Sequence, residues 1–339
     1  MQKLFIISNE KIYIDNNTYY CDNIDLKSTP EGLSNNFEVN LIARKSKVKR
    51  SHKINISNIK IFGTFISFIC GVINLTKKDK EAKYLLISIS PYTFFACIFL
   101  KLLKKRPIIY LRSNGFDEYK IKLGHIGYFI YYLMFNISTA VSKIVSCRKY
   151  ILRGKKGYTI HPSQLNNKWF ENHKEIKNKQ KNLLYVGRVR KEKGIFSLID
   201  IIKNTDIDLT VVGEEDNKID LKNYKNINFI KIINNKHDLI KLYDDHNIFI
   251  LPSYTEGQPM ALLESLSRLR PVIIFDDIEH VIQNRAGIFI SKRNYESLNK
   301  TIHHINTNYE SIQELMKKNQ LPMFKDFVKN LTNIILEDK

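Results

Sequence analysis

The chain has 339 residues, of which 43% are hydrophobic, 11% aromatic and 26% charged, and its formal net charge is +20. These fractions lie close to globular averages, which excludes a disordered chain, a collagen-like repeat and a disulfide scaffold. Because ordinary domains hold about 100–200 residues, the length favours two domains over one.

The positive charge is concentrated in the first half of the chain. Residues 1–180 contain 31 Lys and Arg against 12 Asp and Glu, a net +19, whereas residues 181–339 contain 23 against 22, a net +1. We expect such a basic half to face something anionic, such as nucleic acid, a phosphorylated substrate or an acidic membrane. The alternative is a compositional drift towards Lys, Ile and Asn in an AT-rich genome.

The cysteines indicate reduced thiols, as in a cytosol. Cys21, Cys70, Cys97 and Cys147 form no C-x-x-C pair and have no neighbouring histidines, which argues against a zinc site or a redox motif. The N-terminus holds an apolar run of only four residues before Ser8, too short for a secretory signal. We interpret this run as the first β-strand.

Short runs of β-branched and aliphatic residues recur along the chain and alternate with stretches that can hold helices. This alternation predicts parallel sheets covered on both faces, an α/β, doubly wound architecture that occurs twice. In the first half the expected strands are residues 4–7, 39–43, 84–88, 108–111 and 143–146. In the second half they are residues 183–186, 209–212, 227–230, 248–251, 272–275 and 287–290.

A polar segment separates the two blocks of strands and is typical of a linker. We therefore expect a domain over residues 1–165, a linker over 166–180 and a second domain over 181–320. Residues 321–339 are amphipathic enough to form a final helix.

Three apolar stretches of the first half, residues 61–76, 84–100 and 123–142, are flanked by Lys or Arg. A membrane span needs about 18–20 apolar residues; the first two are short, and the third carries several polar residues. They favour buried helices of an α/β domain. Their aromatic residues beside lysine clusters also fit attachment to a membrane surface.

A basic loop with a glycine at each end, residues 187–194, follows one expected strand and precedes a predicted helix over 195–203. In open α/β sheets ligands bind at such turns, where glycines let backbone N–H groups approach a phosphate. Arg188 and Lys193 then supply positive charge for a diphosphate. Taken alone, the loop is more typical of a solvated loop than of a phosphate site.

A second loop, residues 252–259, also follows an expected strand. Pro259 fits the first turn of a helix, so we expect the loop to end at Gln258. Glu256 then lies at the mouth of the helix and Glu264 more than one turn further along. Two carboxylates at different depths can bind two sets of sugar hydroxyls, and the helix N-terminus between them can bind an anion. The alternative for Glu264 is an ordinary exposed helical glutamate.

Together these motifs resemble the family-four retaining glycosyltransferases, which have the GT-B fold of two Rossmann-like domains facing a cleft. The resemblance covers about residues 181–290. It rests on the two loops, on a strand that ends at Gly213 and on Arg270-Pro271-Val272-Ile273, in the family's order. The sequence looks closest to enzymes that build bacterial surface polysaccharides, such as lipopolysaccharide O-antigens or capsules.

The resemblance implies roles for individual residues. Arg188, Lys193 and Glu256 are the expected catalytic residues, with the two cations on the diphosphate and Glu256 on the donor sugar's hydroxyls. Glu264 is expected on the ribose, backbone N–H groups of residues 257–260 on the diphosphate, and the stretch around Gly213 beside the nucleobase. The residues expected to bind the donor are Gly187, Gly213, Glu214, Gly257, Gln258, Pro259, Met260, Ala261 and Glu264.

The sequence also departs from the family pattern. Leu269-Arg270 stands where a glycine often precedes Pro-Val, and residues 276–280 replace a Gly-Gly-x-Pro-Glu segment. In the first domain a Gly-Gly loop and a histidine are missing, and other residues stand at those places. There we expect the acceptor cleft to be formed by Ser8, Asn9, Arg112, Ser113 and Asn114.

The resemblance further implies retaining transfer of a hexosyl or N-acetylhexosaminyl group from a nucleotide-diphosphate sugar, by a front-face route. The first domain is expected to bind the acceptor, a lipid-linked oligosaccharide or glycan, and the second domain the nucleotide sugar. The final helix either crosses back to the first domain or caps the second. A cytoplasmic enzyme, peripheral to an anionic inner membrane, fits the basic first half.

No metal or other cofactor is expected, because Asp206-x-Asp208 is more typical of a solvated turn than of a metal site. Two other functions stay open. One is a GT-B protein of another activity, such as an epimerase or an inactive partner. The other is a basic nucleic-acid-binding protein. The sequence lacks the regular spacing of arginines and exposed aromatic residues that such a protein would show, so we expect no nucleic-acid partner.

Overall fold

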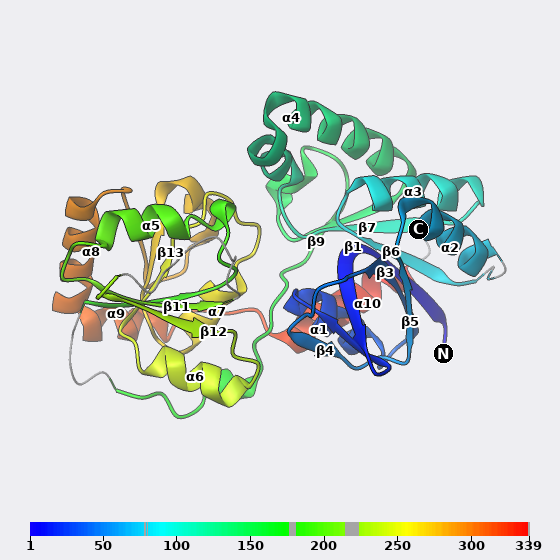
Figure 1. Cartoon of the computed structure of the whole chain (residues 1–339). Coiled ribbons are helices and arrows are strands. Elements are labelled where there is room, and N and C mark those ends of the chain that lie inside the picture. Colours follow the sequence, from blue (N-terminus) through cyan, green and yellow to red (C-terminus); the bar gives the residue numbers. More distant parts are fainter. Residues whose placement is uncertain (78, 80, 176–180, 214–223, 338–339) are drawn as a thin grey trace. The chain divides into compact units, whose positions relative to one another are not determined.

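The computed structural model describes residues 1–77, 79, 81–175, 181–213 and 224–337, and the chain divides into two compact units (Figure 1). Unit 1 comprises Met1–Pro162 and Phe324–Lys339, and unit 2 comprises Ser163–Met323. Each unit has a largely or wholly parallel sheet with helices on both faces. The predicted α/β, doubly wound architecture is therefore confirmed in both units.

The sheet of unit 1 is parallel except at one corner. Its strands run in the order β4-β2-β1-β6-β7-β8-β9, and β3 pairs with both β1 and β5. The first half of β1 pairs in parallel with β3 and β6, and its last residues pair antiparallel with β2. The strands are β1 (Lys3–Asp15), β2 (Thr18–Cys21), β3 (Glu38–Lys45), β4 (His52–Ile54), β5 (Asn58–Phe62), β6 (Lys83–Ile87), β7 (Pro107–Leu111), β8 (Lys143–Ser146) and β9 (Tyr158–Thr159).

Helices cover both faces of this sheet, because alternate side chains of a strand point to opposite faces. Leu4 and Ile6 of β1 pack with α1 and α10, whereas Phe5 and Ile7 pack with α2, α3 and α4. Strands buried on both sides read as continuous apolar runs, which is why the sequence reveals them. The helices are α1 (Ile24–Leu33), α2 (Phe65–Lys77), α3 (Pro91–Leu102), α4 (Gly115–Val141) and α10 (Phe324–Leu336).

The last helix, α10, belongs to unit 1 although unit 2 separates it from the rest of that unit in the sequence. Leu331 of α10 is fully buried in the core beneath the sheet. Lys143 Nζ donates a hydrogen bond to the carbonyl oxygen of Ile334 at 2.7 Å, and Tyr158 Oη donates one to Glu337 Oε2 at 2.6 Å. Packing and hydrogen bonds thus fasten both the middle and the end of α10.

Unit 2 is built on a fully parallel sheet with the strand order β12-β11-β10-β13-β14-β15. From β10 the chain adds β11 and β12 on one side of the sheet, and then β13, β14 and β15 on the other. Ligands of open α/β sheets bind at such a switch point, here between β10 and β13. The strands are β10 (Asn182–Val186), β11 (Asp208–Gly213), β12 (Ile227–Lys231), β13 (Ile248–Leu251), β14 (Val272–Phe275) and β15 (Ile288–Ser291). The helices are α5 (Ile195–Ile202), α6 (Lys236–Asp244), α7 (Met260–Ser267), α8 (Tyr295–Thr307) and α9 (Tyr309–Met316).

The expected strands coincide with observed ones, but several helix boundaries differ. The stretch 61–76 opens with the end of β5, because its apolar run continues from strand into helix without a polar break. Likewise 84–100 contains both β6 and α3. Pro259 caps α7 with an extended backbone (ψ 115°) instead of lying in its first turn. The stretch 123–142 is helical but not buried, since much of α4 is exposed.

The expected linker also contains core residues. Trp169, in the 3₁₀ turn Asn167–Phe170, is 1% exposed and packs in the core of unit 2 beside Leu165. Residues 176–180 of that segment lie outside the described part of the chain. The polar composition of the segment therefore gave no indication that Trp169 belongs to the core.

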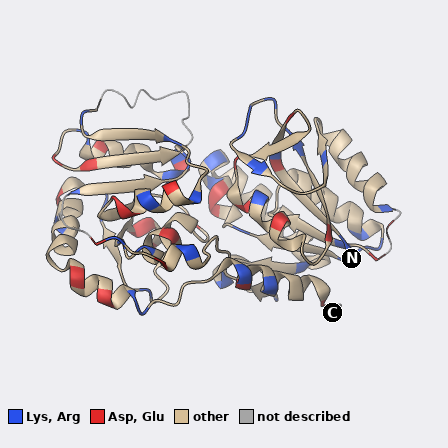
Figure 2. Ribbon diagram, turned by 90° about the horizontal axis from the view of Figure 1, so that it is seen from below, with Lys and Arg blue, Asp and Glu red and all other residues tan. Residues whose placement is uncertain are grey.

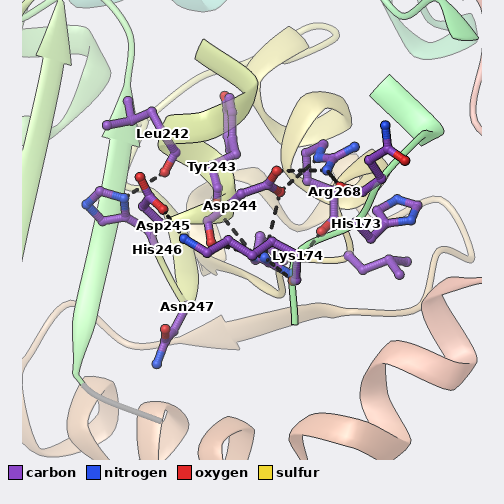
Figure 3. Close-up of polar contacts among 12 residues, drawn as sticks. His173, Lys174, Leu242, Tyr243, Asp244, Asp245, His246, Asn247 and Arg268 are labelled. Carbon is purple, nitrogen blue, oxygen red and sulfur yellow. Dashed lines mark hydrogen bonds and ion pairs between the residues drawn. The ribbon is translucent and has the colours of Figure 1, made fainter. Parts of the chain in front are cut away.

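Two buried arginines, Arg268 and Arg270, fasten the start of unit 2 to its body. Figure 3 shows Arg268 directed at Asp244. Arg268 binds both carboxylate oxygens of Asp244, at 2.9 and 2.8 Å, and donates to the carbonyl oxygens of Trp169, Glu171 and Asn172. Arg270 donates to further carbonyl oxygens, including those of residues 174 and 243. One buried carboxylate and a row of carbonyl oxygens thus satisfy both guanidinium groups.

We predict that Arg268→Ala destabilises unit 2 by about 3–5 kcal/mol, because it leaves Asp244 buried without its bidentate partner. The chain has a single tryptophan, Trp169, in the core of unit 2. Its fluorescence during urea unfolding therefore measures the free energy of this unit.

Lys174→Ala is the matched control, because Lys174 forms an ion pair with Asp245 in which both side chains are exposed. Such a pair contributes at most about 1 kcal/mol. Equal losses of unfolding free energy in the two variants would contradict the role assigned to the buried arginine.

Candidate functional site

The two loops singled out in the sequence meet at the switch point of unit 2. They follow β10 and β13, which are neighbouring strands of the sheet. The backbone N–H of Tyr254 donates to the carbonyl oxygen of Glu192 at 3.1 Å and so joins the loops. Gly194 has φ +66°, and a Cβ there would lie 1.9 Å from the carbonyl oxygen of Pro252. Only glycine permits this approach.

Lys193 and Glu256, one from each loop, form a largely buried ion pair. Lys193 Nζ lies 2.6 Å from Glu256 Oε1, and Ser253 Oγ donates to the same oxygen at 2.7 Å. A ring nitrogen of His280 lies 2.8 Å from the backbone carbonyl oxygen of Glu256. The structure therefore brings two of the expected catalytic residues together and fixes the carboxylate from two sides.

Sequence reasoning missed Ser253 and His280 as members of this site. Ser253 lies in the expected loop but carries no distinctive pattern there. His280 lies in the segment that replaces the family's glycine-rich motif, in the 3₁₀ helix Asp276–Val281. The polar side chains of that replacement, which follow a buried strand, were the available clue.

Gln258 has a buried polar side chain near the start of α7. It is 8% exposed, and neither its Oε1 nor its Nε2 has a hydrogen-bond partner among the described residues. A buried amide without partners costs free energy. An amide presents both a donor and an acceptor, so a ligand group with the same capacity, such as a hydroxyl, can satisfy it.

Glu264 lies deeper along α7 and is partly buried, which distinguishes it from an ordinary exposed helical glutamate. Tyr243 Oη donates to Glu264 Oε2 at 2.9 Å. Burial and the neighbouring Glu264 carboxylate raise the pKa of the Tyr243 hydroxyl well above its usual value. The tyrosine therefore stays protonated and acts as a fixed donor to Glu264.

The backbone on the β10 side of the site is closely packed. A Cβ on Gly213 would lie 2.0 Å from the carbonyl oxygen of Gly187, and Gly187 N donates to the carbonyl oxygen of Val212. The side chain of Arg188 is half-buried, at the end of β10. Glu214, expected near the nucleobase, lies outside the described residues.

The remaining expected donor-binding residues lie where the second loop enters α7. Gly257 and Pro259 are buried, and Met260 and Ala261, in the first turn of the helix, are half-buried. The loop and the helix N-terminus therefore offer backbone N–H groups beside Glu256, as an anion site requires.

Arg293 supports the second loop and was also missed. Its guanidinium lies 3.9 Å from the centre of the Tyr254 ring and 4.4 Å from that of Phe275. It donates to the carbonyl oxygen of Pro252 at 2.8 Å and pairs with Asp277 at 2.7 Å. A basic residue shortly after β15 was the only sequence clue to this role.

In unit 1 the expected acceptor residues lie in two places. Ser8 and Asn9 are in the middle of β1, where its parallel pairing with β3 shifts register, and Arg112, Ser113 and Asn114 directly follow β7. Ser8 Oγ accepts from the backbone N–H of Glu10, Asn9 Oδ1 accepts from Arg44 at 3.1 Å, and Arg112 pairs with Glu10 at 3.3 Å. Glu10 and Arg44 are additions that sequence reasoning missed, although both are charged residues in or after apolar strand runs.

Two of the acceptor candidates lie at the start of α4. Asn114 caps the helix, accepting a hydrogen bond from Phe116 N and donating one to Asp117. Ser113 is half-buried beside it. The cap gives Asn114 a structural function, whatever it binds.

No cluster of three or more His, Cys, Asp and Glu that could hold a metal ion occurs within the described part of the chain. Asp206 pairs with Lys181 at 2.6 Å, and this hydrogen bond lowers the pKa of its carboxyl. Asp208 is exposed at the start of β11.

Residues 167–321 match the family described as glycosyl transferases group 1. The chain is 25% identical over 323 residues to the capsular polysaccharide biosynthesis glycosyltransferase CapM of Staphylococcus aureus, a match that covers 84% of each chain. A shorter match, 30% identical over 139 residues, covers 40% of this chain and 34% of the putative teichuronic acid biosynthesis glycosyltransferase TuaC of Bacillus subtilis.

Solved structures share the fold over nearly the whole chain. HepE of Anabaena, solved with UDP and glucose, has a TM-score of 0.71 at 11% identity and covers 98% of this chain and 99% of its own. Sucrose-phosphate synthase of Thermosynechococcus elongatus has a TM-score of 0.69 at 16% identity, with 99% and 97% covered. WaaG, a glycosyltransferase involved in lipopolysaccharide biosynthesis, has a TM-score of 0.68 at 14% identity, with 98% and 99% covered.

Proposed function

Because the chain is a glycosyltransferase with the GT-B fold, we propose that it transfers a hexosyl or N-acetylhexosaminyl group from a nucleotide-diphosphate sugar with retention of configuration. The proposed acceptor is a lipid-linked glycan at the cytoplasmic face of an anionic membrane. The proposed product is a bacterial surface polysaccharide, a capsule or an O-antigen. The similarity to CapM supports this class of product.

The observation that carries the proposal is the Lys193–Glu256 pair. The same loop holds the buried amide of Gln258, which has no hydrogen-bond partner among the described residues. An ammonium has three donor hydrogens, so Lys193 can keep its contact with Glu256 and also donate to a phosphate oxygen. The Glu256 carboxylate and the Gln258 amide then bind sugar hydroxyls. A diphosphate and a sugar joined to it match this arrangement of charge and hydrogen-bonding groups.

The chemistry follows from where charge develops. As the bond from the sugar to the diphosphate breaks, negative charge grows on the leaving phosphate, and donors already in place lower the barrier. Lys193, Arg188 and the backbone N–H groups of 257–260 are the proposed donors. In the front-face route the acceptor hydroxyl attacks from the side on which the diphosphate leaves and passes its proton to it.

Glu264 is proposed to bind the ribose. Tyr243 occupies one of its carboxylate oxygens and fixes its orientation, and a carboxylate accepts several hydrogen bonds at once, including those from vicinal hydroxyls. The structure of HepE with UDP and glucose supports a nucleoside diphosphate as the ligand class.

We predict that one nucleotide of a panel of UDP, GDP and CMP with their sugar conjugates raises the Tm of the protein. A ligand at about 100 times its Kd adds roughly 2.7 kcal/mol of stability. Glu264→Ala abolishes this shift because the ribose loses its acceptor.

Glu314→Ala is the control, because Glu314 is an exposed helical glutamate of α9, and its shift stays as in the wild type. A Glu264→Ala variant with unchanged nucleotide affinity would remove Glu264 from the ribose.

Lys193→Ala is expected to reduce turnover by about 10²–10³, the usual effect of losing one donor to a developing charge. Lys191→Ala, an exposed lysine of the same turn, is expected to leave turnover unchanged. The readout is sugar transfer to a lipid-linked acceptor, and a thermal melt checks that both variants are folded. Wild-type turnover in a folded Lys193→Ala protein would refute its assignment to the diphosphate.

We propose that the positive charges and the helix N-terminus replace a metal ion in this reaction. Turnover is then expected to be unchanged after treatment with a strong chelator and removal of free divalent ions. A loss that Mg²⁺ or Mn²⁺ restores would contradict this prediction.

A further inference from the structure

The outer face of α4 is apolar and exposed, which is unusual for a helix at a protein surface. Exposed large hydrophobic residues number 22 among the described residues, and nine of them lie on this one helix. Their exposed fractions run from 36% to 72%. The nine are Ile121, Leu123, Ile126, Tyr128, Phe129, Ile130, Tyr132, Leu133 and Ile137.

The pattern along α4 is that of two apolar faces. The residues at 127, 131, 134, 135 and 138 are buried against unit 1, at helical spacing. A second set at 126, 130, 133 and 137 has the same spacing and points outwards. A helix that is apolar all round is normally buried in protein or in lipid. The outer stripe of α4 therefore indicates a partner.

Neighbouring helices extend this face. α2, α3 and α4 pack side by side on the same side of the sheet (Figure 1). Ile66 of α2 is 75% exposed, and Leu102 of α3 is 70% exposed. We call the exposed apolar residues of these three helices the apolar face.

Most charges around the apolar face are basic, although the first turn of α4 also carries Asp117 and Glu118. No acidic residue lies between Glu81 and Asp117, where there are six Lys or Arg, or between Glu118 and Glu171, where there are nine (Lys and Arg are blue in Figure 2). Lys101, at the end of α3, and Lys120, near the start of α4, are exposed. This complementarity favours an anionic partner over a second copy of the same basic surface, which would repel it.

The helix is not suited to crossing a bilayer. No helix of the described chain is long and apolar enough to span a membrane. A non-helical backbone at Gly124 (φ 65°, ψ −150°) divides α4 into two arms, and the first arm carries Lys120 and Lys122. Aromatic and aliphatic side chains beside lysines are typical of helices that lie in the plane of a membrane surface.

We propose that the apolar face is a docking surface for an anionic lipid bilayer. The outer stripe of α4 inserts among the acyl chains nearest the headgroups, and the lysines at the ends of α3 and α4 bind acidic headgroups. This inference deepens the proposed function and rests on its lipid-linked acceptor, since docking would hold unit 1 where such an acceptor lies.

The test is flotation of the full chain with two kinds of vesicle, one of phosphatidylcholine alone and one with 30 mol% phosphatidylglycerol. We expect the protein to float with the anionic vesicles and far less with the neutral ones. Ile126→Glu/Phe129→Glu should reduce the fraction bound at least about tenfold, because it places two charges among acyl chains. Lys101→Gln/Lys120→Gln should reduce the partition coefficient about fivefold for each lysine.

The matched control is Ile290→Glu/Leu315→Glu, which alters two exposed apolar residues of unit 2 and should float as the wild type does. Equal flotation of the α4 variant and the wild type would overturn the proposal. The proposal would also be overturned if the wild type did not bind anionic vesicles and sedimented as a dimer, while the α4 variant sedimented as a monomer. The apolar face would then be an interface between two copies.

The nucleotide-induced shift in Tm separates this proposal from the proposed function. A wild type that shows the shift but does not float overturns the docking surface alone. A wild type that floats but binds no nucleotide sugar keeps the docking surface and removes the sugar-transfer function. The shift also verifies that each variant is folded.

Discussion

The buried carboxylate of Asp244 supports the architecture of unit 2. It neutralises Arg268 and, at 3.7 Å, Arg270, and the carbonyl oxygens around these arginines belong to the segment that enters the unit. Arg268 follows the last turn of α7, whose first turn lies at the candidate site. Asp244 itself ends α6, next to the tyrosine that orients Glu264. The ion pair between Asp244 and Arg268 thus links the end of α7 to the end of α6, where Tyr243 orients Glu264.

The site resolves a conflict between stability and binding. A buried ammonium or carboxylate without a partner would lose solvation without gain, so Lys193 and Glu256 stabilise each other through their ion pair. Gln258 is different, because its buried amide has no hydrogen-bond partner in the part of the chain that the structure describes. The free energy that burial of the Gln258 amide costs is recovered only when a ligand with a matching donor and acceptor binds. Gln258 therefore selects for ligands that carry such groups.

The strands buried on both faces and the two loops could be predicted from the sequence, because such a strand leaves a continuous apolar run and a switch-point loop follows it directly. The short strands β2, β4, β5 and β9 were not predicted. The antiparallel pairing of β1 with β2 could not be predicted either, since Tyr13–Asp15 pairs with β2 through backbone groups that carry no residue pattern. His280 and Arg293 were missed because they reach the site from loops after β14 and β15. Trp169 was missed because its neighbours in sequence are polar, although its ring contacts core residues.

The division of the chain has a consequence for how the protein is made. Unit 2 is complete in sequence at Met323, whereas unit 1 lacks α10 until its last residues have been synthesised. Domains usually fold as they leave the ribosome, beginning with the N-terminal one. Here the later unit can finish first, while one face of the unit 1 sheet is covered only in part, by α1, until Phe327, Leu331 and Ile335 pack there. Loss of α10 would therefore damage unit 1, which begins the chain, more than unit 2, which directly precedes this helix.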